Sequence, residues 1–347
     1  MSNGTNKTRL MQFLVNEWSS SMYADKIGAR ALYVSHGSNC TKIEVVEGKI
    51  LSCLVSQLHS NQEEADTRMF LHACHASSCG HTSIPIRSSD TDVEVLACYY
   101  QASITASITL ISGTRCRSRL IRVPSIFEKL GPDICQVLPG LHSLTRCDTI
   151  STFVGKGKKK ALKIVKERQH MRQKLRGIGE TVPPSDELLR NTECFVCALY
   201  NGSDKDGVNE IRYKMFCRTK NIQSYQLPPT KAALTEHIKR ANYQANLWKN
   251  ALESSVEGLQ PDGQVWQLKG GQLELFWSDL AAAPQGVLEL VCCGCKRPCN
   301  SKRCSCVRIG LPCTEACACS DDCRNCSLDK GDESQSEDDE YEEEEEN

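Results

Sequence analysis

Residues 83–100 read SIPIRSSDTDVEVLACYY, and this stretch passes from a strand pattern to a helix pattern. Residues 83–87 favour a short strand, the polar run 88–90 ends it, and 93–100 begin a helix. The β-branched run 107–111 then predicts a second strand. Because strands that alternate with helices form parallel pairs covered by those helices, the sequence predicts an α/β body. We expect a mainly parallel sheet with helices on both faces, a three-layer α/β/α arrangement.

Further elements are expected on both sides of this stretch. Helical spacing of apolar residues covers 8–19, 61–76 and 124–168, with a Gly-Lys-Gly interruption at 155–157. A long helix follows Thr230, which is a good helix cap. Shorter signals are a strand at 31–34, proline breaks at 182–185 and 227–229, and a hairpin over 265–277.

The length and composition of the chain limit the number and kind of domains that it can contain. It has 347 residues, of which 40% are hydrophobic, enough for a sizeable core and for more than one domain. No apolar run approaches about 20 residues and the first residues are polar, so we expect neither a membrane span nor a secretory signal. The expected regions are a body over 1–180, a helical and hairpin extension over 181–290, a small cysteine-rich module over 291–326 and a disordered acidic tail over 327–347.

The charge of the chain is unevenly distributed. Its formal net charge is −1, yet residues 329–347 hold twelve acids and one lysine, a net of −11. Residues 1–328 therefore carry +10. A basic body predicts a polyanionic partner, and the acidic tail is typical of an interaction or masking segment.

Half of the 22 cysteines lie in residues 292–326. Without a secretory signal we expect a reducing compartment, so this cluster predicts metal ligands in preference to a secreted disulfide framework. Zinc takes four soft ligands in a tetrahedron, and nine thiolates supply the twelve ligand positions of three zinc ions if three of them bridge. The candidate ligands are Cys293, Cys295, Cys299, Cys304, Cys306, Cys313, Cys317, Cys319 and Cys323.

The segment 293–319, CGCKRPCNSKRCSCVRIGLPCTEACAC, resembles the tesmin-type CXC (cysteine-rich, CRC) domain. This resemblance implies nine-thiolate coordination of about three zinc ions and contact with DNA, with Lys302 and Arg303 among the cations that the loops present. Family members often end Cys-x-Cys-x2-Cys. Here three residues follow Cys319, so either Cys323 or Cys326 is the last ligand. Arg303 also stands where many members have a DNA-reading tyrosine, and a structural zinc knot for protein contact is the alternative.

Acidic residues recur where strands should end or helices should begin. Carboxylates at the carboxyl edge of a parallel sheet converge on one crevice, and hard oxygen ligands suit magnesium or manganese. Two such ions can activate water and stabilise a leaving phosphate oxygen. The simpler alternative is a set of solvated acids at helix N-termini. The candidate catalytic residues are Glu64, Asp66, Asp90, Asp92 and Asp148.

The order of these acids and the glycine turn that follows resemble the flap endonuclease (XPG-like) nucleases. In that family a Gly-x-Gly turn lets backbone amides approach a DNA phosphate and a basic helix follows, within a helix–two-turn–helix. The segment 138–165, LPGLHSLTRCDTISTFVGKGKKKALKIV, carries the resemblance. It implies that the DNA-binding residues are Gly155, Lys156, Gly157, Lys158, Lys159 and Lys160.

The wider pattern is similar to PIN-like open reading frames with a CXC tail that derive from mobile elements. Two departures bear on catalysis. The family's sheet opens with a strand that ends in a metal-binding aspartate, and we expect this chain to lack that strand. Arg146 also replaces a glycine, where we expect it to be strained or to pair with Asp148.

The sequence thus predicts a nuclear DNA-binding zinc protein with a magnesium- or manganese-dependent nuclease body. The alternatives are a catalytically inactive CXC-type chromatin regulator and an inert translated product. The sequence carries no signal for an oligomeric state.

Overall fold

The computed structural model describes residues 4–113, 118–218, 223–255, 265–276, 292–296, 298–309, 312–313, 317–319 and 323–325. The chain divides into two compact units, Met1–Ser278 and Asp279–Asn347. The predicted acidic tail and Cys326 lie outside the described residues. Each unit is treated separately below.

The first unit begins with a helix and an antiparallel meander. Helix α1 (Gly4–Trp18) precedes two short helical turns, η1 (Ser21–Tyr23) and α2 (Ala24–Ile27). Strands β1 (Leu32–His36), β2 (Asn39–Val46) and β3 (Lys49–Leu54) then form a sheet in that order. Glu47 (φ 52) and Gly48 (φ 75) form the β2–β3 turn, and two consecutive positive φ values are the conformation that a two-residue hairpin needs.

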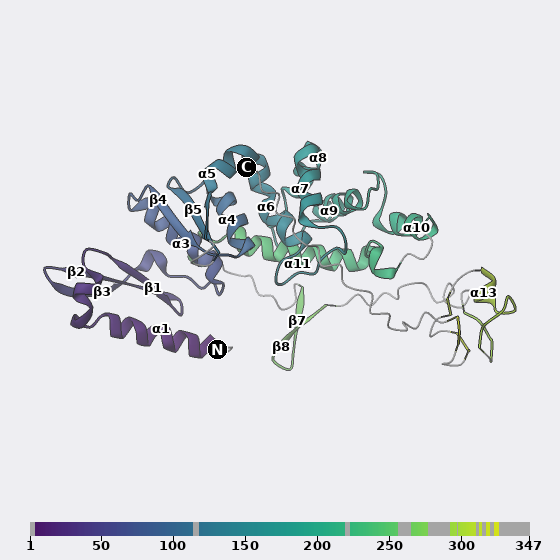
Figure 1. The fold of residues 1–347 in the computed structure, drawn as a ribbon, viewed down its shortest axis with the longest axis horizontal. Coiled ribbons are helices and arrows are strands. Elements are labelled where there is room, and N and C mark those ends of the chain that lie inside the picture. The colour runs from purple at the N-terminus through teal and green to yellow at the C-terminus, as the bar shows by residue number, and fades with distance from the viewer. Residues whose placement is uncertain are drawn as a thin grey trace. The chain divides into compact units, whose positions relative to one another are not determined.

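The second sheet contains the stretch that decides the fold class. After η2 (Ser56–Leu58), helix α3 (Ala65–Ser78) leads to β4 (Ser83–Arg87), α4 (Thr91–Tyr100), β5 (Ser107–Ser112) and β6 (Arg119–Arg122). The strand order is β4-β5-β6, with α3 and α4 beside the sheet (Figure 1). Strands β4 and β5 are parallel, as the strand–helix–strand pattern predicts.

The prediction of a mainly parallel sheet is wrong for the described strands. Only the β4–β5 pair is parallel among them, whereas the β1–β2, β2–β3, β5–β6 and β7–β8 pairs are antiparallel. The reason is the length of the connections. A parallel crossover needs a dozen or more residues, and the links 37–38, 47–48 and 113–118 are too short for one. The structure is a mixed α/β body with small sheets.

Helices make up the remainder of the first unit. They are α5 (Val123–Leu130), α6 (Pro132–Thr145), α7 (Lys158–Glu167), α8 (Gln169–Leu175), α9 (Asp186–Leu199), α10 (Val208–Arg218), η3 (Ser224–Gln226) and α11 (Lys231–Lys249). The expected helical region 124–168 is interrupted at Gly131, where φ is 80, and again by the non-helical segment 146–157. Thr230 caps α11 as predicted, because its hydroxyl accepts the N–H of Ala233 at 3.3 Å.

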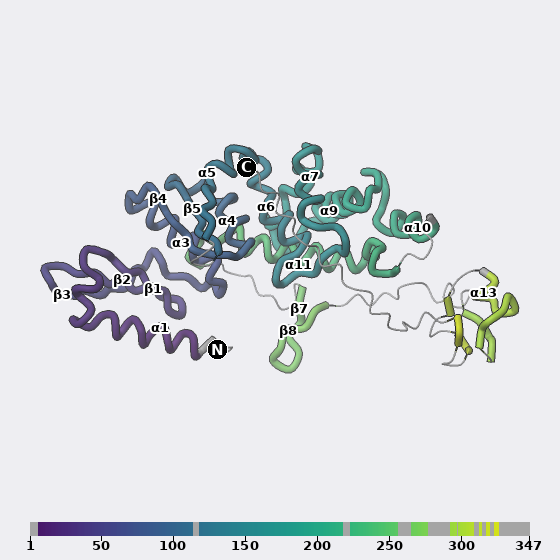
Figure 2. The backbone as a smooth tube through the Cα atoms, in the orientation of Figure 1, coloured from purple at the N-terminus to yellow at the C-terminus, as the bar shows by residue number. Residues whose placement is uncertain are grey.

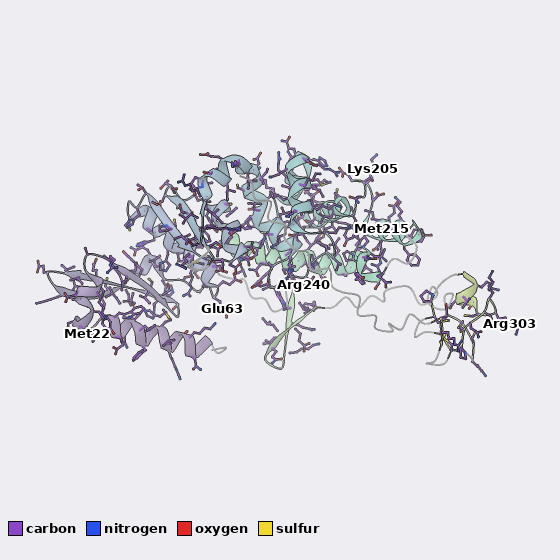
Figure 3. The ribbon with its side chains drawn as sticks, in the orientation of Figure 1. Met22, Glu63, Lys205, Met215, Arg240 and Arg303 are labelled. Carbon is purple, nitrogen blue, oxygen red and sulfur yellow. The ribbon has the colours of Figure 1, made fainter. Side chains whose placement is uncertain are left out.

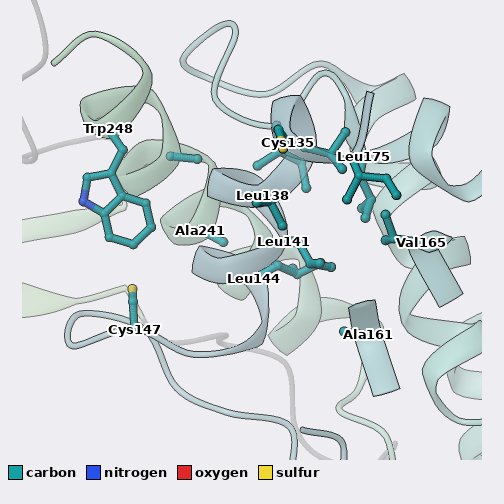
Figure 4. Packing of buried hydrophobic residues seen from close by; sticks show 14 of the residues in the cluster. Cys135, Leu138, Leu141, Leu144, Cys147, Ala161, Val165, Leu175, Ala241 and Trp248 are labelled. Carbon is teal, nitrogen blue, oxygen red and sulfur yellow. The ribbon is translucent and has the colours of Figure 1, made fainter. Parts of the chain in front are cut away.

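The main hydrophobic core of the described residues in this unit extends from Phe70 on α3 to Ala251 beyond α11, and a separate small cluster contains Cys40, Leu58 and Leu71. Helix α6 lies at its centre. Its apolar side chains have Ala241 and Trp248 of α11 on one side and Val165 and Leu175 on the other (Figure 4). The predicted boundary at residue 180 falls inside this core. The backbone traces of α6 and α11 lie side by side (Figure 2).

The predicted hairpin is present as β7 (Trp266–Lys269) and β8 (Gln272–Leu275), joined at two glycines with positive φ, Gly270 and Gly271. Its last predicted residue, Trp277, lies outside the described residues. Among the helices that the structure describes, none has both the length and the apolar character that a membrane crossing requires.

Candidate functional site

Three segments carry the five predicted acids to one edge of the body. Glu64 is the N-cap of α3 and Asp66 lies in the first turn of this helix. Asp90 and Asp92 occupy the same two positions on α4, directly after β4 ends. Asp148 follows α6, within the small bridge between Cys147 and Ile150. The helix dipole favours acids at helix N-termini, which is the local reason for the positions of the four acids on α3 and α4.

The pKa of Asp66 shows that the acids lie near one another. The pKa of its carboxyl group is raised from 3.8 to about 6, first by burial and then by the charges of Asp90, Asp92, Glu64 and Asp148, in that order. All four predicted partners therefore act on this one carboxylate. A bound cation would reverse the effect of the neighbouring charges, so the cluster has the electrostatic character of a cation site.

Each of three acids has a defined hydrogen-bond partner. The Asp90 carboxylate caps α4 by accepting the N–H of Asp92 at 2.9 Å. The Asp92 carboxylate lies 2.6 Å from Nε2 of His142 on α6. The Glu64 carboxylate accepts the amide of Gln244 at 3.2 Å and the indole N–H of Trp248 at 3.3 Å, both from α11.

Sequence reasoning missed His142, Gln244 and Trp248. The sequence did contain a signal for His142, because it is a polar residue among apolar ones such as Leu141 and Leu144. The structure buries all three on α6. Gln244 and Trp248 are four residues apart on α11 and hence share a helix face. Nothing in their local sequence connects them to an acid that precedes them by about 180 residues.

The donor set fits a hard divalent cation in its chemistry, because carboxylate oxygens are the ligands that magnesium and manganese prefer. The acids are less closely gathered than the cysteines described below. In the described parts of the chain, the sets of ligand atoms that all lie within 4.8 Å of one another consist of cysteines.

The predicted phosphate-binding turn lies next to this acidic edge. Gly155 has a φ of 66, which favours glycine, and a Cβ at Gly155 or Gly157 would meet no atom within 4 Å. Gly157 is the N-cap of α7 and provides no side-chain cap for the amides of its first turn. The ammonium group of Lys158 lies 3.4 Å from Nε2 of His142, so the basic helix and the acids share a neighbour.

The other lysines of the turn extend along the surface of α7. Lys156 lies over the ring of Tyr200, 5.1 Å from its centroid, and Lys160 donates to Asn201 at 2.9 Å. Lys159 is exposed. The turn thus presents an open backbone flanked by cations, as a phosphate contact requires.

Arg146 differs from its prediction. Its φ of 164 is extended backbone that any residue adopts, so replacing a glycine here introduces no strain. Among the described residues, no ion pair joins Arg146 to Asp148. The expected competition of Arg146 for the metal site is therefore absent from the described contacts.

An open cleft of about 1350 Å³ adjoins the acidic edge. Glu63 and Ala65 at the start of α3 line it, as does Arg87 at the end of β4, and Lys7 and Arg68 add positive charge. Glu63 itself is labelled in Figure 3. The cleft gives an extended anionic ligand room to approach the acids.

In the second unit, all nine predicted cysteines form one cluster. Three sets of four have sulfur atoms within 4.8 Å of one another. Cys313 belongs to all three sets, and Cys293, Cys299 and Cys319 to two each. The sets are Cys293, Cys313, Cys317 and Cys319; Cys293, Cys299, Cys304 and Cys313; and Cys299, Cys313, Cys319 and Cys323.

The sulfur separations match zinc coordination. Four sulfurs at about 2.3 Å from one zinc lie about 3.8 Å apart at the corners of a tetrahedron. The Cys293 and Cys299 sulfurs are 3.6 Å apart, those of Cys304 and Cys313 3.9 Å, and those of Cys306 and Cys317 3.7 Å. These cysteines are free thiols, so the described cluster is not a disulfide framework. The cluster is compatible with zinc binding.

The surroundings of the cluster bear on two predictions. Cys323 is buried in it, whereas the other candidate for the last ligand, Cys326, lies outside the described residues. A hydrogen bond from the Val307 backbone lowers the pKa of Cys304 to about 6, which favours the thiolate that a metal needs. Lys302 and Arg303 are exposed in the turn before α13 (Ser305–Ile309), and Arg303 is labelled in Figure 3.

No protein-family model matches the chain, and neither a curated protein nor a solved structure matches it. The functional argument therefore depends on the residues and their geometry.

In the parent, the ionised Asp66 carboxylate lowers the free energy of unfolding, and this effect depends on pH. We expect the Asp66→Asn variant to remove it. The Asp66 carboxyl titrates near 3.8 when unfolded and near 6 when folded. The folded state therefore binds the proton more tightly, and the free energy of unfolding falls as the pH rises from about 4 to about 6. The cost is absent below this range and complete above it. In urea titrations without divalent cations, the variant should exceed the parent in stability at pH 7.5 and approach it near pH 4.

The control for this experiment is Asp133→Asn, an exposed aspartate in the first turn of α6. It should leave the pH dependence of the parent unchanged. An Asp66→Asn variant whose stability follows pH as steeply as that of the parent would contradict the assignment.

Replacing Cys313 should remove more metal than replacing Cys317. Cys313 belongs to three of the four-sulfur sets, whereas Cys317 belongs to one. Elemental analysis of the purified full chain should show Cys313→Ser losing most of its bound zinc and Cys317→Ser retaining more than half. Cys53→Ser removes an exposed thiol of β3 and should leave the metal content unchanged. Equal losses in the two cluster variants would argue against shared thiolates.

Proposed function

We propose that this chain is a DNA-binding zinc protein derived from a mobile-element nuclease, with a three-layer, PIN-like body and a C-terminal CXC module holding about three zinc ions. Its body would cleave phosphodiester bonds with magnesium or manganese, and the protein would act in the nucleus. The observation that carries this proposal is the position of Lys158. It lies 3.4 Å from His142, which in turn lies 2.6 Å from Asp92.

This arrangement supports phosphoryl chemistry because it combines two requirements of that reaction. The open turn at Gly155 and Gly157, with its lysines, can bind the phosphate backbone of DNA. The five acids beside it can hold divalent cations that would supply an activated water and stabilise the leaving oxygen. A phosphate bound at the turn would therefore lie close to the acids.

The residues of the chain would have distinct roles in this site. Asp90 and Asp92 would be the central ligands, with Glu64, Asp66 and Asp148 around them. Lys158 would bind a phosphate oxygen while its neighbours hold the flanking backbone. The cleft lined by Arg87, Arg68 and Lys7 would receive the rest of the strand.

A catalytically inactive DNA-binding or chromatin regulator is the second candidate. It is favoured by the spacing of the acids, which lie farther apart than the cysteines do. In this case the zinc module, with Lys302 and Arg303 exposed, would carry DNA binding together with the turn. The two candidates share DNA binding and differ in cleavage.

DNA binding by the full chain should be strongly salt-dependent. Each phosphate neutralised adds about 0.9 to the slope of log affinity against log salt. Lys159→Gln removes one exposed cation of the turn and should reduce that slope by about one, whereas Lys205→Gln, in an exposed loop, should not.

Deleting 329–347 should tighten binding, because the acids compete for the same cations. Fluorescence anisotropy over a salt series measures these effects, and weaker binding after tail deletion would contradict them.

Cleavage of flap and hairpin DNA with manganese separates the two candidates. We expect slow cleavage by the parent and at least a hundredfold loss in the Asp90→Asn, Asp92→Asn double variant, which keeps side chains of the same shape. The matched control is Asp186→Asn with Glu187→Gln, two exposed acids in the first turn of α9. A parent that binds DNA and does not cleave it would support the inactive regulator.

A further inference from the structure

His142 is a buried donor to an acid of the proposed metal site. Its side chain is 4% exposed, that of Asp92 is 15% exposed, and Nε2 of His142 lies 2.6 Å from Oδ1 of Asp92. The contact uses Oδ1, so Oδ2 of the same carboxylate is the oxygen available to a cation. Because α6 is packed at the centre of the core, the imidazole provides a rigid support for that carboxylate.

Trp248 is likewise a buried hydrogen-bond donor to Glu64. Its indole N–H donates to Oε2 of Glu64 at 3.3 Å, and the Trp248 side chain is buried. The backbone around Trp248 is itself fixed, because the Tyr100 hydroxyl donates to the Trp248 carbonyl at 2.6 Å and accepts the N–H of Ala251 at 3.0 Å. The support for Glu64 therefore extends to α4, the helix that carries Asp92.

The two supporting rings touch one another. The centroids of His142 and Trp248 are 5.6 Å apart, with the ring planes tilted by 43°. Each ring contacts one acid through a ring nitrogen and also packs against the other ring. Glu64 and Asp92, which come from different helices, are thus linked through one pair of rings from two further helices.

We infer that His142 and Trp248 are positioning residues that hold the Asp92 and Glu64 carboxylates in fixed orientations for a divalent cation. This inference rests on the proposed metal-dependent function. Outer hydrogen bonds of this kind orient metal ligands, and their loss typically weakens metal affinity by about 10- to 100-fold. The pair would also keep the two carboxylates apart while the site is empty, so that binding a cation needs little rearrangement.

The test is manganese affinity of the full chain, measured from the electron paramagnetic resonance signal of free Mn²⁺. His142→Ala should weaken binding at least tenfold, whereas His142→Gln should stay within about threefold of the parent, because the amide can donate to the same oxygen. Trp248→Phe keeps a ring against His142 but removes the N–H, and it should also weaken binding several-fold. These variants make the inference testable even if one of them folds poorly.

The matched control is His237→Gln. His237 is similarly buried, at 5% exposed. Its Nε2 lies 2.8 Å from the Leu144 carbonyl and its Nδ1 lies 3.2 Å from the Ser151 hydroxyl, so neither of these partners is an acid. This change should leave manganese affinity within about twofold of the parent, whatever its effect on the unfolding midpoint, which is measured without metal. An equal loss of affinity in this control would show a general structural effect and overturn the inference.

Two further outcomes distinguish a failure of the proposed metal site from a failure of the positioning role alone. A parent that does not bind Mn²⁺ would refute the metal site and this inference with it. A parent that binds Mn²⁺ as tightly as His142→Ala and Trp248→Phe do would leave the metal site intact and refute the positioning role alone.

Discussion

The burial of one carboxylate and the mutual repulsion of five impose a cost that the helices around them offset. Glu64, Asp66, Asp90, Asp92 and Asp148 approach closely enough for the pKa of Asp66 to rise to about 6, through burial first and then through the other four charges. Such a cluster persists only where donors and helix dipoles offset part of its cost. Helices α3 and α4 supply their N-termini, and α6 and α11 supply the donors His142, Gln244 and Trp248. The central helices thus serve both the core and the site.

The two units gather chemically different ligands. The first unit presents carboxylate oxygens, which are hard donors, and the second presents thiolates, which are soft. For the two proposed metal sites, this separation would let one chain bind two kinds of cation with little competition, because zinc prefers sulfur ligands and magnesium or manganese prefer oxygen ligands. It also separates their consequences. Among the described residues, Val307 is the non-cysteine hydrophobic residue packed against the cysteine cluster, so a metal would stabilise its fold directly, whereas the first unit has a core of its own.

The sequence was informative wherever a local rule was sufficient. The strand–helix–strand pattern at 83–111, the cap at Thr230 and the hairpin at 266–275 follow from short-range propensities, and the structure contains all three. The nine-cysteine spacing likewise predicts a cluster that the structure contains. The mainly parallel sheet was predicted wrongly because the alternation pattern was extended to strands whose short connections permit only antiparallel pairing. The partners Gln244 and Trp248 could not be predicted, because α11 reaches Glu64 through tertiary packing that leaves no local signal in the sequence, whereas His142 stood out only as a polar residue in an apolar helix.

The contribution of α11 has a consequence for the time at which the site can form during synthesis. All five acids leave the ribosome before residue 150, but Gln244 and Trp248 follow almost a hundred residues later. Until then Glu64 lacks its donors and the core of α6 lacks one of its sides. A nascent or prematurely terminated chain would therefore expose its acids without holding them in place. The completed set of contacts thus belongs only to chains translated past α11, and the nuclease activity proposed above would be confined to them.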